Sequence, residues 1–589
     1  MNKYDLLVNV LDNLRSEAPE SYKTYHKSDT PENIQKGRSL ALIHLFLKVK
    51  FGVNDFLERH ELITDGTFDG GIDAYFIDQD NLKIHIIQSK CRNNEESFNS
   101  KPVNAEELVK IELGRIIKGD EISLDGNKYN DKIIHFQKKL REIRDIARYD
   151  YIIDIIGNVR NYRDEIIRRL LDNSMYEIYN SDKIYNDLLF PISKSTYFDP
   201  KEIIIKLDLD NKDQTKYKTK IETDFGEYFI TVLFVPTFEI GKILNKYKNS
   251  ILVYNPRNYL SLSNNAVNQQ IRSSIMTQSK NNFALLNNGI TIISDNVQTS
   301  DSVGEKNIGQ LILTRPQIIN GGQSAYVLSE IYDEAPNKAN SPLSQKEVLL
   351  KIITPIDGKK EINQNFIQLI STSTNSQSEV DEADQRSNHS IQINLEKLIF
   401  ENFGYFYERK KGQYYEALNK GIIPKERIIN RLDFIKSVHF YQGNPSNARR
   451  SSEKLLFSVD KFISIVGNID NYMEMFFSFL IFKKLNEIES KFKKIKESQE
   501  KYGNCFTYGK YALIAAIGCK KEHIPSTYKD MNDLVDLLVA DRLEKWNAFE
   551  KFTSEKLSNS KYFSKGKRNF DLYYKISSLD IDIKEFFMK

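Results

Sequence analysis

The stretch from residue 65 to residue 90 constrains the fold more than any other part of the chain. It contains two runs with strand character, residues 72–77 and 82–90, and the polar tetrapeptide between them is typical of a turn. Side chains alternate between the two faces of a strand, so the second run places three apolar residues and then Gln88 and Lys90 on one face. Polar side chains are not expected at the end of a buried face unless that face opens there into a site. The stretch therefore predicts a β-hairpin that ends in a functional site.

Asp73 lies on the first arm, where pairing of the two arms would bring its carboxylate close to Gln88 and Lys90. One carboxylate, one amide oxygen and one ammonium suit metal-assisted hydrolysis of a phosphodiester, because Mg²⁺ prefers oxygen ligands. We predict a metal site formed by Asp73, the Gln88 side-chain carbonyl and the Ser89 backbone carbonyl, for Mg²⁺ with Mn²⁺ as the alternative ion. Asp73, Gln88 and Lys90 are the predicted catalytic residues, with Lys90 positioning or deprotonating the attacking water or offsetting charge on the phosphate. The alternative is a surface hairpin with solvated side chains.

Several motifs together resemble known families. DGGIDAYFID followed by IHIIQSK resembles the core of PD-(D/E)xK nucleases, in the QxK form found in type IV restriction endonucleases. Four later motifs resemble the abortive-infection phage-resistance (AIPR) family, and the whole resemblance covers about residues 30–450. These motifs are FALLNNGITIIS (283–294), RPQIINGGQSAYVL (315–328), STNSQSEV (373–380) and YERKKG (407–412).

The nuclease resemblance implies a helix before the hairpin that often supplies a further acidic metal ligand. Residues 33–51 are apolar nearly all round, which predicts a buried helix, but this helix has no internal acid. The candidates for the missing ligand are Glu32, Glu58, Glu61, Asp65 and Asp69. For the two aspartates, capping of a glycine-rich turn is the favoured interpretation.

At 589 residues, the chain is long enough for two to four domains, and its net charge of +3 limits any nucleic-acid surface to a local groove. Three dispersed cysteines argue against a disulfide framework and for a reducing cytoplasm. Cys91 adjoins the predicted site, but no base accompanies it, so a spacer thiol is favoured over a nucleophile. We find no signal-peptide pattern and no apolar run long enough to span a membrane, which indicates a cytoplasmic protein without membrane association.

Alternating strand and helix patterns predict an α/β restriction-endonuclease-like domain over residues 1–195. Within it we expect helices at 104–118, 131–148 and 160–173 and a buried strand at 149–158. An α+β AIPR region is predicted for residues 196–450, with strands at its start and a turn-rich link at 216–226. A mostly helical region is predicted for residues 451–589.

Two downstream features could contact phosphate. Residues 320–324 form a glycine-rich strand-to-helix turn, for which a tight turn and helix cap are favoured over anion binding. Arg409, Lys410, Arg449 and Arg450 are candidate nucleic-acid-binding residues, with solvated surface cations as the alternative.

Together these features predict a Mg²⁺-dependent endonuclease for antiphage defence that cuts DNA, with RNA as an open alternative. A second hypothesis is a non-catalytic nucleic-acid-binding or phage-sensing protein with a decayed nuclease core. We expect a homodimer, and a phage-derived trigger as a further partner.

Overall fold

The predicted hairpin is present and forms two strands of a four-stranded sheet. The strands are β1 (Ala74–Asp78), β2 (Lys83–Ser89), β3 (Asp150–Ile156) and β4 (Met175–Tyr179). β1 pairs antiparallel with β2, and β2–β3 and β3–β4 are parallel, which gives the order β1-β2-β3-β4. The strand predicted at 149–158 is confirmed as β3.

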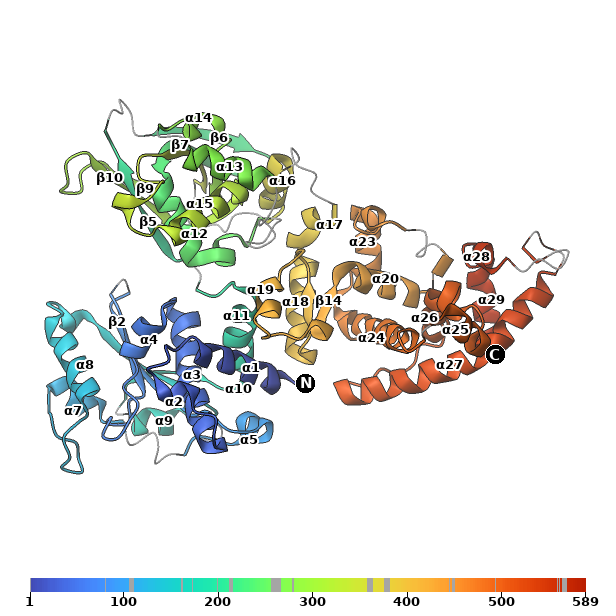
Figure 1. Ribbon diagram of the computed structural model, residues 1–589, viewed down its shortest axis with the longest axis horizontal. Helices are drawn as coiled ribbons and strands as arrows, with labels where there is room; N and C mark the ends of the chain where they lie inside the picture. The colour runs from blue at the N-terminus through green and yellow to red at the C-terminus, as the bar shows by residue number, and fades with distance from the viewer. Residues whose placement is uncertain are drawn as a thin grey trace. The chain divides into compact units, whose positions relative to one another are not determined.

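The computed structural model describes the chain apart from residues 1, 80, 105–110, 160–162, 172, 199, 211–215, 256–265, 278–279, 357–363, 376–381, 444, 447–450, 493, 559, 561, 564–568 and 589. The chain separates into two compact units, Met1–Asn363 with Gln413–Lys425, and Gln364–Gly412 with Glu426–Lys589. Figure 1 shows strands throughout the first unit and mainly helices in the second. The three predicted domains and their boundaries stay a prediction.

One face of the four-stranded sheet is covered by the buried helix predicted before the hairpin. This helix is α3 (Pro31–Phe51), which begins after the capping residue Thr30 and ends at Gly52 in the left-handed conformation. Its Phe51 ring stacks on Phe76 of β1, with centroids 4.2 Å apart. The prediction of a buried helix at 33–51 is therefore confirmed.

The opposite face packs on α8 (Asp131–Glu142), where Phe136 stacks against Tyr75 of β1. Other predicted helices are shorter than expected. α7 (Leu113–Lys118) ends at Gly119, while residues 105–110 of the same prediction lie outside the described residues, and α9 spans Asp164–Leu170. The remaining helices of this part are α1 (Lys3–Ser16), α2 (Lys23–His26), α4 (Phe56–Glu61), α5 (Glu95–Ser100), α10 (Ser181–Ile184) and α11 (Phe190–Lys194).

Two further sheets follow in the first unit. Their strands are β5 (Glu202–Asp208), β6 (Tyr217–Thr223), β7 (Gly226–Pro236), β8 (Ile290–Ile293), β9 (Asn296–Ser300), β10 (Ile308–Thr314), β11 (Gln317–Asn320) and β12 (Glu347–Pro355). The orders are β5-β10-β9 and β11-β8-β12-β7-β6. The segment predicted as a turn-rich link at 216–226 is instead mostly strand β6, so that prediction is wrong. The helices of this part are α12 (Thr237–Tyr247), α13 (Ala266–Met276), α14 (Phe283–Leu286), α15 (Gly322–Glu334) and α19 (Tyr415–Asn419).

The second unit is mostly helical, as predicted for the C-terminal region. Its one described strand pair is β13 (Phe406–Glu408) with β14 (Ile428–Asn430), which run parallel. Its helices are α16 (Gln364–Asn375), α17 (Glu382–Gln385), α18 (Ser390–Phe403), α20 (Arg431–Tyr441), α22 (Glu453–Leu456), α23 (Val459–Val466), α24 (Tyr472–Glu489), α25 (Ile495–Tyr502), α26 (Lys510–Gly518), α27 (Tyr528–Lys556), α28 (Phe570–Tyr573) and α29 (Ser578–Phe587). The chain thus combines mixed α/β structure with a helical C-terminal region.

Candidate active site

Backbone hydrogen bonds fix Asp73 at the start of the β1–β2 hairpin. Its N–H donates to the Ile87 carbonyl at 2.9 Å, and its own carbonyl accepts from the N–H groups of Thr64 and Asp65. Asp73 Oδ2 also accepts from the Ser89 N–H at 2.6 Å. Pairing of the arms thus brings the Asp73 carboxylate to the end of β2, as the sequence predicted.

Asp73, Gln88, Ser89 and Lys90 line one pocket beside this hydrogen bond, with a cavity volume of about 380 Å³. Helix α3 contributes to the same wall. The structure therefore brings together every residue predicted for catalysis or metal binding at this hairpin, while their chemical roles stay predictions.

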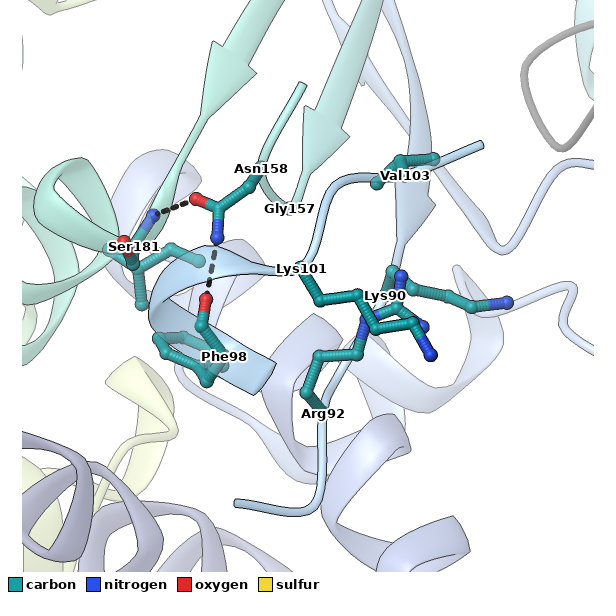
Figure 2. Close-up of a pocket in the computed structure, with 9 residues that line it drawn as sticks. Lys90, Arg92, Phe98, Lys101, Val103, Gly157, Asn158 and Ser181 are labelled. Carbon is teal, nitrogen blue, oxygen red and sulfur yellow. Dashed lines mark hydrogen bonds between the residues drawn. The ribbon is translucent and has the colours of Figure 1, made fainter. Parts of the chain in front are cut away.

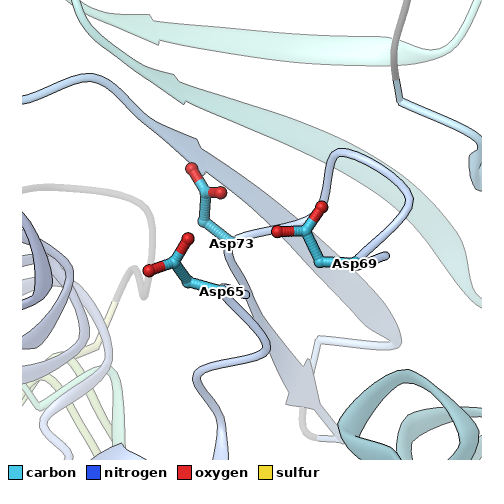
Figure 3. Close-up of side chains that lie close together, drawn as sticks. All are labelled: Asp65, Asp69 and Asp73. Atoms are coloured by element: carbon cyan, nitrogen blue, oxygen red, sulfur yellow. The ribbon is translucent and has the colours of Figure 1, made fainter. Parts of the chain in front are cut away.

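Three aspartates gather next to the Asp73–Ser89 hydrogen bond (Figure 3). One potential ligand oxygen from each of Asp65, Asp69 and Asp73 lies within 4.8 Å of the other two. Asp69 accepts hydrogen bonds from the N–H groups of Gly71 at 2.9 Å and Gly66 at 3.1 Å, so its capping role in the turn is confirmed. Among the described residues, no hydrogen bond reaches the Asp65 carboxylate, and Asp65 is therefore the better partner for Asp73 in a cation site.

The Asp65 carboxylate disfavours the charged forms of Asp69 and Asp73. The pKa of Asp73 is raised to about 7, mainly by burial and in part by the Asp65 and Asp69 carboxylates, whereas the Ser89 N–H and Lys90 oppose the shift. Burial also raises the pKa of Asp69. A divalent cation would offset the repulsion that disfavours the charged form of these groups. Because every donor of the cluster is an oxygen, the residues fit a hard ion such as Mg²⁺ or Mn²⁺.

The helix before the hairpin does not supply the further acidic ligand. It reaches the pocket through Ser39 and Ile43, and the described lining includes none of Glu32, Glu58 and Glu61. The carboxylates that do lie beside Asp73 are those of Asp65 and Asp69, in the loop that precedes β1. The sequence signal for Asp65 was the position of an aspartate eight residues before Asp73, on the other side of a glycine-rich turn.

Cys91 and His85 take part in packing and hydrogen bonding. Burial raises the pKa of the Cys91 thiol to about 11, which makes it a poor nucleophile, and its carbonyl accepts from the Gln35 side chain at 3.1 Å. His85 is buried on the opposite face of β2, where its Nδ1 lies 2.7 Å from Asp154 Oδ2. Neither residue contributes a reactive group to the pocket.

The two predicted nucleic-acid-binding cations that the structure describes are buried. Arg409 and Lys410 are 5% and 2% exposed. Arg409 Nε donates to Glu396 at 3.0 Å and its Nη1 donates to the Ser387 carbonyl at 2.9 Å. A buried guanidinium that is already paired offers no face to a phosphate, so phosphate contact by this pair is an unsupported prediction. Arg449 and Arg450 lie outside the described residues.

Two of the four downstream motifs, at 283–294 and 315–328, contact each other through a hydrogen bond. Asn287 Nδ2 donates to Ser324 Oγ at 2.7 Å, and Gly321, with φ +81°, precedes helix α15. A Cβ on Gly321 would lie 2.6 Å from the Gly289 carbonyl oxygen. The glycine-rich turn at 320–324 thus permits a close backbone approach and starts a helix, as the favoured interpretation predicted. Most of the motif at 373–380 lies outside the described residues.

Comparison with known protein families gives one match. A family model described as AIPR protein matches residues 252–562, which is more than half of the chain. No curated protein and no solved structure matches the chain. A search of the helices in the described part finds none that is long and apolar enough to cross a membrane.

Proposed function

The chain belongs to the AIPR family, and from this premise we propose that it is a cytoplasmic, metal-dependent endonuclease of abortive-infection phage defence. Family membership points to the defence role. The nuclease activity is our inference from the pocket that contains Asp73, Gln88 and Lys90, with Asp65 beside them. DNA is the favoured substrate because the Gln-Ser-Lys sequence resembles that of restriction nucleases.

Each residue of the pocket has a proposed task. The Asp73 and Asp65 carboxylates and the Gln88 carbonyl would hold the cation, together with the Ser89 carbonyl. Mg²⁺ would supply Lewis-acid stabilisation of the phosphate and a bound water of lowered pKa. Lys90 would orient or deprotonate the attacking water, or offset the charge that builds on the phosphate.

The surrounding fold supports this proposal. A buried helix followed by a mixed sheet, with the acidic and basic residues at one end of a hairpin, is the arrangement that the resemblance to PD-(D/E)xK nucleases implied. A restriction-endonuclease-like fold for residues 1–195 is therefore part of the proposal. A homodimer would place two such sites on opposite strands of a duplex, and a phage-derived trigger would release the activity.

The main alternative is a non-catalytic binding or sensing protein with the same fold. An intact aspartate, glutamine and lysine around one pocket argue against it, since decay of activity would remove the pressure to keep them together. An RNA endonuclease is the second alternative, because DNA and RNA both carry the phosphodiester that these groups would hydrolyse.

The test uses the purified full-length protein with plasmid, single-stranded DNA and RNA, in Mg²⁺ and in EDTA. We expect cleavage in Mg²⁺ alone. Asp73→Asn keeps the size of the side chain and an acceptor for the Ser89 N–H, and it should lose both cleavage and Mg²⁺ binding measured by calorimetry. Lys90→Ala should lose cleavage and retain Mg²⁺ binding.

Asp131→Asn is the matched control, because Asp131 is exposed in the first turn of α8 and should leave cleavage unchanged. Cleavage in EDTA, or full activity of Asp73→Asn, would disprove the site assignment. A folded wild-type protein that cuts none of the three substrates would favour the binding or sensing alternative.

A further inference from the structure

An exposed aromatic residue stands in the loop that carries the aspartate cluster. Phe68 directly precedes Asp69, and its side chain is 49% exposed. Its backbone has φ +63°, in the left-handed region that bulky residues rarely adopt. Within the described part of the chain, the Phe68 ring forms no stacking contact with another ring and no cation–π contact. Packing therefore gives little reason for a bulky side chain at this strained position.

Neighbouring groups impose the backbone conformation of Phe68. The Asn130 N–H donates to the Phe68 carbonyl at 3.0 Å. On the other side, Asp69 accepts from the N–H groups of Gly66 at 3.1 Å and Gly71 at 2.9 Å, which closes the turn. Backbone strain persists where the surrounding structure over-determines it, and such residues cluster at functional sites. The loop thus holds an aromatic ring at the surface, beside the aspartate cluster.

Phe198 provides an informative comparison. It also has a left-handed backbone, with φ +62°. Its ring stacks on Tyr247 with centroids 5.5 Å apart, and Lys246 Nζ lies 5.2 Å from its centroid. These contacts account for Phe198 in its strained conformation. The described contacts include no equivalent for Phe68, so a contact outside the folded chain is the better explanation for its ring.

The crevice that adjoins the site at Lys90 has no room for a base. Figure 2 shows Lys90, Arg92 and Lys101 around this crevice, together with Asn158. Its cavity volume is about 10 Å³, which is space for about one water. A base beside the cleaved phosphate needs another place, and Phe68 offers it a flat apolar face.

We propose that the Phe68 ring stacks on an unpaired base of the substrate, next to the phosphate at the aspartate cluster. This inference rests on the proposed function and specifies its substrate as a strand with unpaired bases near the cut, in a single strand or an opened duplex. Aromatic side chains bind single strands by such stacking, which tolerates any base. The Cα atoms of Phe68 and Asp69 are about 3.8 Å apart, so one strand can reach both the ring and the cluster. Phe68 is thus a binding residue that does not touch the reacting atoms.

The test measures binding instead of cleavage. The full-length protein is titrated in EDTA, at a series of salt concentrations, with labelled single-stranded DNA, single-stranded RNA and duplex DNA of one sequence. Phe68→Ala should raise the Kd for both single strands about tenfold, and it should leave the Kd for the duplex nearly unchanged. The slope of log affinity against log salt should stay at its wild-type value, because that slope reports phosphate contacts and the ring makes none. Phe68→Tyr keeps an aromatic face and should keep the wild-type Kd.

Tyr217→Ala is the matched control, because it removes another exposed ring, 65% exposed on β6 of the same compact unit, and it should change none of the three Kd values. Calorimetry should give Phe68→Ala the Mg²⁺ affinity of the wild type, which separates lost stacking from a rearranged aspartate loop.

The proposal is wrong if Phe68→Ala matches Tyr217→Ala, if it weakens binding of the duplex as much as binding of the single strands, or if it also weakens Mg²⁺ binding. It is also wrong if the wild-type protein binds neither single strand. Failure of the nuclease proposal would look different. The wild-type protein would then bind single strands without cutting them in Mg²⁺, and Phe68→Ala would still weaken that binding.

Discussion

Replacement of Gly321 by alanine should destabilise the protein by more than the cost of the left-handed backbone conformation alone. Gly321 has φ +81°, and a Cβ there would lie 2.6 Å from the Gly289 carbonyl oxygen and 2.8 Å from Ile290 Cα. Both neighbours are backbone atoms, so they cannot rotate away. The left-handed conformation costs an alanine about 1–2 kcal/mol, and overpacking costs about 1–3 kcal/mol. The free energy of unfolding should therefore fall by about 2–5 kcal/mol, if the two costs add.

Gly304 provides a matched control. It has the same φ of +81° and lies in the same compact unit, but a Cβ there would meet nothing within 4 Å. Gly304→Ala should cost only the conformational part, about 1–2 kcal/mol. Urea denaturation of the two variants beside the wild type measures the difference. Equal losses in the two variants would refute the inference that close backbone approach, and not only a turn conformation, requires glycine in the NGGQS motif.

Two further predictions concern pH and phage. Burial lowers the pKa of His44 to about 2, and its neutral ring accepts from Arg59 Nε at 3.0 Å. Because the folded pKa lies below the unfolded value, the contribution of His44 to the free energy of unfolding is fully present above about pH 6.5. Below that pH this contribution should fall by about 1.4 kcal/mol per pH unit. Because other groups also titrate over this range, the test compares variants: between pH 7.5 and 5.5, urea denaturation should give the wild type and the exposed control variant His135→Gln the same pH dependence. In His44→Gln the slope of the free energy of unfolding against pH should differ from the wild-type slope by about 1.4 kcal/mol per pH unit below pH 6.5, and an unchanged slope would contradict the assignment. A bacterial host that expresses the wild-type protein should resist some phages, and one that expresses Asp73→Asn at the same level should not; equal plaque counts, on a phage that the wild type restricts, would show that protection does not depend on this site.

Much of the hairpin could be predicted because its determinants are local. Alternation of apolar and polar residues in β2 and the polar turn before it fix which arm pairs with which, and this pairing alone brings Asp73 to Ser89. The buried helix α3 was equally predictable, since its apolar residues surround the helix on all sides. Local patterns of this kind survive folding unless a tertiary contact competes with them.

The remaining features depend on contacts that no local pattern contains. Asp65 joins the cluster because a bridge between Ile63 and Ala74 closes the loop between them. Strand β6 was missed because nearly all its side chains are exposed on both faces, so it lacks the alternation of a half-buried strand. Arg409 has the sequence environment of a surface cation, but its ion pair with Glu396 of α18 buries it. For Arg409, polarity predicted exposure, and tertiary pairing overrode it.

The defence role and the nuclease activity rest on different parts of the chain. The family match covers residues 252–562, whereas Asp73 and Lys90 lie well before it, so membership in the family neither requires nor excludes catalysis by the hairpin. The two statements can therefore fail separately. If Asp73→Asn abolishes cleavage and still protects against phage, defence belongs to the matched region and the hairpin serves another purpose. If cleavage and protection are lost together while the variant stays folded, the N-terminal pocket is the effector, and the matched region must act through recognition or control of the substrate.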